Sequence, residues 1–65
     1  MNFDRFTEQA WADHGDAPAA VAERIATQGL ALATEPAQLP RLVHLTHHVY
    51  GDHLGHWQAG RDLLQ

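Results

Sequence analysis

Histidine is the residue with the clearest chemical potential in this sequence, because five of the six histidines lie between residues 44 and 56. His44 and His48 are four residues apart, so a helix would place their imidazoles one turn apart, with Asp52 continuing the same line. Zn²⁺ or Ni²⁺ could bridge such a pair. Zinc normally takes three or four protein ligands, and neither a cysteine nor an H-E-x-x-H motif supplies the others. The pattern therefore favours a polar helix face, with a metal site at His44, His48 and Asp52 as the alternative.

His53 has a different predicted position from its neighbours. With about 100° of rotation per residue, it falls in the apolar arc of the helix, beside Val49 and Tyr50. A buried histidine usually stays neutral and donates a ring N–H to a nearby acceptor. The sequence therefore predicts a structural role for His53, and the alternative is a pH-sensitive packing element that loosens when acid protonates the ring.

The composition argues against several classes of function. Serine and cysteine are both absent, so the commonest nucleophile and base pairs cannot be assembled, and we expect neither catalysis nor a cofactor. A formal charge of −4, with four scattered arginines and no lysine, argues against nucleic-acid binding. No signal-peptide pattern and no apolar run of roughly 20 residues is present. We expect a cytoplasmic protein that does not bind membranes, with the alanine-rich, lysine-free composition typical of a bacterial source.

Helical signals cover most of the chain. A first helix is predicted within residues 2–15, capped by Asn2 or Asp4, or by Thr7, which would place Phe6 and Trp11 in a hydrophobic staple. His14 falls in its last turn, where a protonated imidazole would complement the exposed carbonyls, and Gly15 ends it.

A second helix follows Asp16-Ala17-Pro18, with Asp16 as the capping acceptor and Pro18 in the first turn. Gly29 lies on its apolar face, where a glycine favours either a close helix contact or a break. Residues 34–40 form a connection, and the helical period resumes at Arg41. No alternating strand pattern appears, so we predict a single all-α domain, residues 1–65, of three to four short helices.

The last segment predicts an antiparallel helical hairpin. Gly55 suits the left-handed position that ends a helix, Trp57 would pack back onto Leu54 and Tyr50, and Gly60 would let the two backbones approach.

This segment resembles the tetratricopeptide repeat in the places occupied by Leu54, Gly55, Trp57, Gly60 and Leu64. It departs from the repeat at His47 and His48, which stand where the family has a leucine and a small residue, and Gly60 replaces the usual alanine. The resemblance covers about a third of the chain, and it implies a scaffold that binds other proteins without a cofactor.

These observations together predict a small helical module for protein–protein interaction or assembly. A chain this short buries only about 60% of its unfolded surface, and no disulfide can compensate, so we expect a protein partner or self-association as a homodimer or larger homo-oligomer. The candidate contact residues are Trp11, Leu30 and Leu45, at the margins of the predicted apolar arcs. The alternative function is metal binding or pH sensing through histidine.

Overall fold

The computed structural model describes residues 1–65 and contains four helices and no strand, which confirms the all-α prediction. Helix α1 spans Phe3–Asp13. The second helix is continuous from α2 (Pro18–Arg24) through the π-helical segment η1 (Ile25–Gly29) to α3 (Leu30–Leu32). The third comprises α4 (Gln38–Thr46) and a second π-helical segment, η2 (His47–His53), and the last is α5 (Trp57–Leu63).

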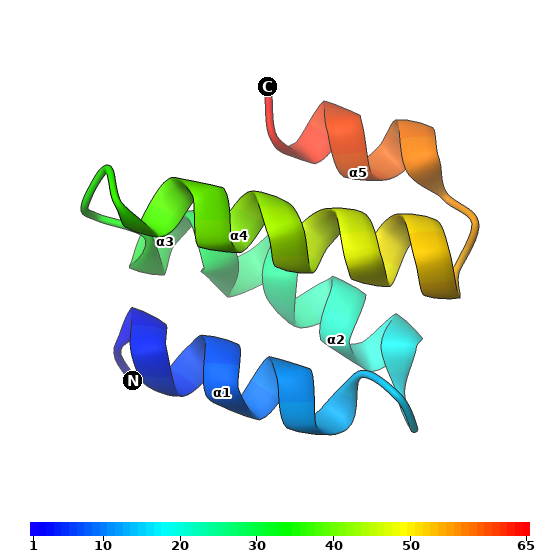
Figure 1. Cartoon of the computed structure of the whole chain (residues 1–65), viewed down its shortest axis with the longest axis horizontal. Helices are drawn as coiled ribbons and strands as arrows, with labels where there is room; N and C mark the ends of the chain where they lie inside the picture. Colours follow the sequence, from blue (N-terminus) through cyan, green and yellow to red (C-terminus); the bar gives the residue numbers. More distant parts are fainter.

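Helices α1 and α4 run side by side in the same direction, whereas α2 and α5 run the opposite way (Figure 1). At the start of both parallel helices, Arg41 donates a hydrogen bond to the Asp4 carboxylate at 2.8 Å and another to Thr7 at 3.3 Å. Its guanidinium also lies 5.1 Å from the centroid of the Phe3 ring. These contacts join the start of α1 to the start of α4, and the parallel packing of the two helices brings their other ends together.

The hydrophobic core lies between the first three helices. Its buried apolar residues follow helical spacing on one face of each helix, and they are Phe3, Phe6, Ala10, Val21, Ala22, Ile25, Leu42, Leu45 and Val49. Leu45 is fully buried, so its predicted role as an exposed contact is wrong. The reason is that both α1 and the second helix pack against the third helix, which centres the buried arc nearer to Leu45 than its own periodicity indicated.

Trp11 is also not freely exposed, because it is half-buried against the core. Leu30, which is 46% exposed, is the one predicted contact residue that lies open on the surface. No helix in the structure combines the length and the apolar character needed to cross a membrane.

The first helix starts at Asn2, whose side chain accepts a hydrogen bond from the Arg5 backbone N–H at 2.8 Å. The prediction of a start at Thr7 is wrong, because Phe3 and Phe6 are both core residues and the helix must already be formed there to bury them. The second helix begins after Ala17 without a side-chain cap, so the predicted capping role of Asp16 is also wrong.

Three glycines fix how the helices approach one another. The helix continues through Gly29, where an added Cβ would lie 3.0 Å from Leu42 Cδ1, so the close-contact alternative is correct. Gly55 has φ +69°, which confirms the predicted left-handed turn. Gly60 is buried, and an added Cβ there would lie 3.0 Å from Tyr50 Cβ, as expected for a close backbone approach.

Trp57 packs back across the turn onto the third helix. Its ring covers Gly51, where a Cβ would lie only 2.1 to 2.4 Å from three ring atoms, and the residue remains 51% exposed. The hairpin formed by η2 and α5 therefore has two close contacts at glycines, the Trp57 ring on Gly51 and the Tyr50 Cβ beside Gly60.

Candidate metal centre

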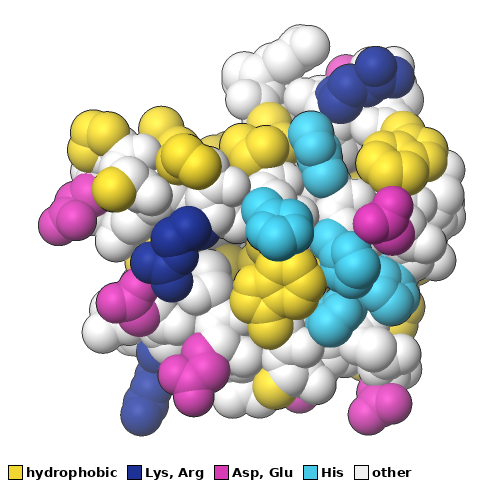
Figure 2. Space-filling model, in the orientation of Figure 1, with side chains coloured by type: hydrophobic (Ala, Val, Ile, Leu, Met, Phe, Trp, Pro, Cys, Tyr) yellow, Lys and Arg dark blue, Asp and Glu magenta, His cyan; other side chains and the backbone are white.

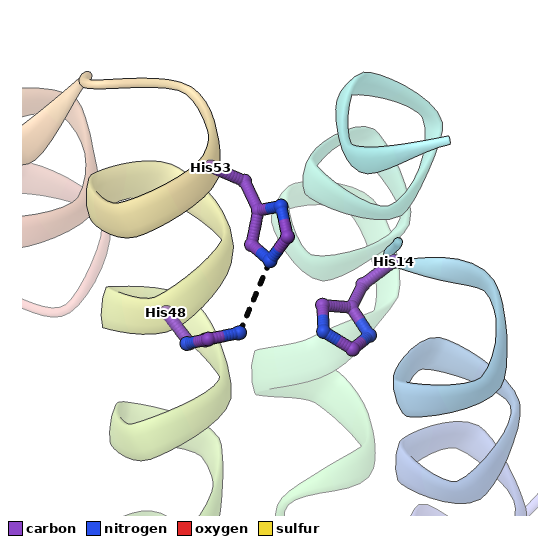
Figure 3. Close-up of side chains that lie close together, drawn as sticks. All are labelled: His14, His48 and His53. Carbon is purple, nitrogen blue, oxygen red and sulfur yellow. Dashed lines mark hydrogen bonds between the residues drawn. The ribbon is translucent and has the colours of Figure 1, made fainter. Parts of the chain in front are cut away.

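Three histidines from two helices converge at one end of the α1 and α4 pair (Figure 3). His14 follows α1, and His48 and His53 lie on η2. Each offers one ring nitrogen, and these nitrogens all lie within 4.8 Å of one another. The group is at the surface, since His53 is exposed and the other two are half-buried.

The π-helical geometry of η2 brings His48 and His53 together. In such a segment the backbone hydrogen bonds join residues five apart and the helix is wider, so residues i and i+5 share one face, whereas in an α-helix they are about 140° apart. His48 and His53 have this spacing, and their Nε2 atoms lie 3.1 Å apart. The predictions that His53 is buried and acts as a pH-sensitive core residue are therefore wrong, because they assumed an α-helical rotation that this segment does not have.

His14 completes the group from the end of α1. Its Nδ1 donates a hydrogen bond to the backbone carbonyl of Trp11, three residues earlier. The ring therefore contacts a carbonyl of the last turn as predicted, through a hydrogen bond that requires no charge on the ring. The parallel course of α1 and α4 then places this imidazole beside η2, with ring centroids 5.0 Å from His48 and 4.9 Å from His53. No pattern in the sequence indicates this contact, because it depends on how two helices that are distant in the chain pack together.

Hydrogen bonds determine which nitrogens are free to bind an ion. The Trp11 carbonyl and the Asp52 carboxylate accept hydrogen bonds, so Nδ1 of His14 and Nδ1 of His48 must carry the hydrogens. The distance from His48 Nδ1 to Asp52 Oδ2 is 3.0 Å. With Nδ1 carrying the hydrogen, the neutral form of each ring has its lone pair on Nε2. The lone pair of His48 accepts a 3.1 Å hydrogen bond from Nε2–H of His53, so an ion bound here would replace this proton. Metal-ligating histidines are usually oriented in this way, by a carboxylate or a backbone carbonyl on the other nitrogen.

The spacing of the rings agrees with three ligands of one ion. For Zn–N bonds of about 2.05 Å, two nitrogens at a tetrahedral angle lie about 3.3 Å apart and their ring centroids about 5.2 Å apart. The observed centroids lie 4.7 to 5.0 Å apart, and the interplanar angles are 61°, 85° and 74°. The three rings thus form a corner, and small side-chain rotations would bring all three nitrogens onto one ion.

The group that the structure brings together differs from the metal site that the sequence suggested. His48 belongs to the group, whereas Asp52 contacts the outer nitrogen of His48 and not the converging nitrogens. His44 packs against Trp11, with ring centroids 5.3 Å apart, and lies outside the group. The i, i+4 spacing of His44 and His48 therefore does not bring their ring nitrogens together. The histidine that meets His48 on this helix is His53, five residues later.

Trp11 forms the wall beside the histidines. Its ring centroid lies 5.1 Å from that of His14 and 5.3 Å from that of His48. Figure 2 shows that histidine side chains gather on this face of the molecule. The apolar indole restricts the motion of both rings, so the site has one rigid side and one side open to solvent.

An ion pair beside the site holds α1 against α2. Asp13 accepts hydrogen bonds from Arg24 at 2.8 Å and from Gln9 at 3.1 Å. The Arg24 hydrogen bond, with a smaller contribution from Gln9, lowers the pKa of the Asp13 carboxyl from its ordinary value of 3.8. This pair fixes the end of α1 immediately before His14.

Comparison of the chain with protein-family models, with curated proteins and with solved structures found no match.

Proposed function

We propose that this protein binds a divalent transition-metal ion, with Zn²⁺ as the best-fitting candidate, through His14, His48 and His53. The observation that carries the proposal is that one ring nitrogen from each of three imidazoles lies within 4.8 Å of the others. Two of the rings are oriented by a hydrogen bond from Nδ1 to an acceptor. Imidazole nitrogen is a preferred ligand of Zn²⁺, and also of Co²⁺, Ni²⁺ and Cu²⁺.

A bound ion would join α1 to η2, two elements that are far apart in the sequence. Such a link closes a long loop in a 65-residue chain that has no disulfide. Because the unfolded chain does not hold the three histidines together, binding free energy adds to the stability of the fold. The proposed ion is therefore structural at the least.

The proposal is tested by titrating the tag-free protein with Zn²⁺ in a calorimeter, because an affinity tag would add histidines of its own. We expect one ion per chain. Replacing His14 or His53 by Ala should weaken binding severely. The matched control is His47→Ala, which removes an exposed histidine on the same helix that lies outside the group.

A fourth variant separates this site from the one that helical spacing alone suggests. His44→Ala should leave the affinity close to that of the wild type, because His44 contacts Trp11 and not the three ligands. Equal loss of binding in His44→Ala and His47→Ala, with no special effect of His14→Ala, would show diffuse binding to surface histidines and would contradict the proposal.

A second candidate function is protein–protein interaction or self-assembly through exposed apolar side chains. Leu39 and Val43 lie one turn apart on α4 and are 46% and 37% exposed, and Trp57 is 51% exposed. The resemblance of the last hairpin to a tetratricopeptide repeat supports the same function.

The interaction candidate is tested by sedimentation equilibrium of the wild type and of a Leu39→Glu, Val43→Glu double variant. A dimer that dissociates in the double variant supports it. Ala19→Glu is the control, because it adds a negative charge at an exposed position on α2. A monomeric wild type at all concentrations would contradict self-association.

A further inference from the structure

The histidine group offers three protein ligands to an ion. The atoms that lie within 4.8 Å of one another and can bind an ion come from His14, His48 and His53. The neighbouring carboxylates are engaged elsewhere, Asp52 with His48 Nδ1 and Asp13 with Arg24. The chain has no cysteine. An ion held here therefore has no fourth ligand from its own chain.

The direction of the missing ligand follows from the shape of the site. In a tetrahedral centre, the fourth position lies on the side away from the other three ligands. The three rings form a corner (Figure 3). Trp11 packs beside His14 and His48, and His53 is exposed at the surface. The fourth position consequently faces solvent.

The charge of the site selects the kind of ligand that would enter. Three neutral imidazoles leave the 2+ charge of the ion uncompensated, and the Asp52 carboxylate lies beyond the His48 ring, hydrogen-bonded to its other nitrogen. Closed structural zinc sites have four protein ligands, whereas sites with three protein ligands keep an exchangeable position. An anion that binds through one atom suits this position in both charge and size.

We infer that the ion bound by His14, His48 and His53 keeps an exchangeable fourth position that takes a small monodentate anion from solution. This inference rests on the proposed metal-binding function. It distinguishes a centre that can bind ligands from one that only joins two helices.

The experiment uses Co²⁺, whose visible absorption reports the ligands of the ion. The tag-free protein is loaded with Co²⁺ and titrated with azide, while equilibrium dialysis verifies that the ion stays on the protein. We expect a saturable spectral change at one azide per bound Co²⁺, retained in His47→Ala. His14→Ala should lose the parent spectrum, because it removes a ligand.

Each other result overturns a defined part of the argument. If Co²⁺ binds but its spectrum changes neither with azide nor with protein concentration, a ligand from the same chain occupies the fourth position. If the spectrum does not change with azide but changes with protein concentration, a second copy of the protein supplies the fourth ligand. Both results refute the open position and leave metal binding intact, whereas failure of Co²⁺ and Zn²⁺ to bind at all refutes the proposed function as well.

Discussion

Asp52 Oδ2 lies 3.0 Å from Nδ1 of His48, and this contact fixes the ring nitrogen that His48 turns toward His14 and His53. Without it, the exposed side of η2 would allow the ring to rotate or to change tautomer. The carboxylate also makes the opposite nitrogen a better electron donor. Asp52 is therefore expected to influence an ion that it does not touch.

Replacing Asp52 by Ala should weaken Zn²⁺ binding about tenfold or more, because the orienting hydrogen bond is lost while the three ligands remain. Calorimetric titration measures the change. Asp62→Ala serves as the control, because it removes an exposed acid of the same charge on α5. Equal affinities in the two variants would show that Asp52 acts only through overall charge.

Zinc should raise the melting temperature of the wild type. At a free concentration about 100 times the dissociation constant, binding stabilises the fold by about 2.7 kcal/mol, which corresponds to a rise of roughly 10–20 °C for a domain of this size. Thermal unfolding followed by circular dichroism measures it. The rise should disappear in His14→Ala and persist in His47→Ala. A shift that survives in His14→Ala would place the ion elsewhere.

Replacing Gly51 by Ala should destabilise the protein by about 1–3 kcal/mol, because the new methyl group would overlap the Trp57 ring and displace α5. Urea unfolding measures the loss. Gly15→Ala is the matched control, since no heavy atom lies within 4 Å of a Cβ at that position. The additional change Trp57→Ala should relieve much of the penalty, and failure to do so would contradict the overlap as its cause.

Tyr50 should make stability sensitive to alkaline pH. Burial raises the pKa of its phenol above the ordinary value of 10.0. The unfolded chain therefore loses this proton first, so the stabilisation is complete below pH 10.0 and is lost as the pH rises through the folded pKa. The chain has one tyrosine and no lysine, so few other groups titrate in this range.

The variant Tyr50→Phe isolates this effect. It should be about 1 kcal/mol less stable near neutral pH, because the hydroxyl donates a 3.0 Å hydrogen bond to the Ala22 carbonyl. Its stability should also decline less than that of the wild type above pH 10.0. Parallel alkaline slopes in the two proteins, measured by urea unfolding, would contradict the assignment.

The sequence by itself determined the features that depend on neighbouring residues. The apolar periodicity specified an all-α chain, Gly55 marked the left-handed turn, and His14 was placed against the carbonyls that end α1. These features could be predicted because helix periodicity, turn conformation and capping are set by residues within about one helical turn.

Only the tertiary structure decided which histidines meet. His14 reaches His48 because α1 lies parallel to α4, and that register depends on contacts such as Arg41 with Asp4, far apart in the chain. His53 joins them because η2 is π-helical, while a prediction at 100° per residue turned it into the core. The second helix and α5 both pack against η2, so its conformation belongs to the assembled fold and not to the local sequence.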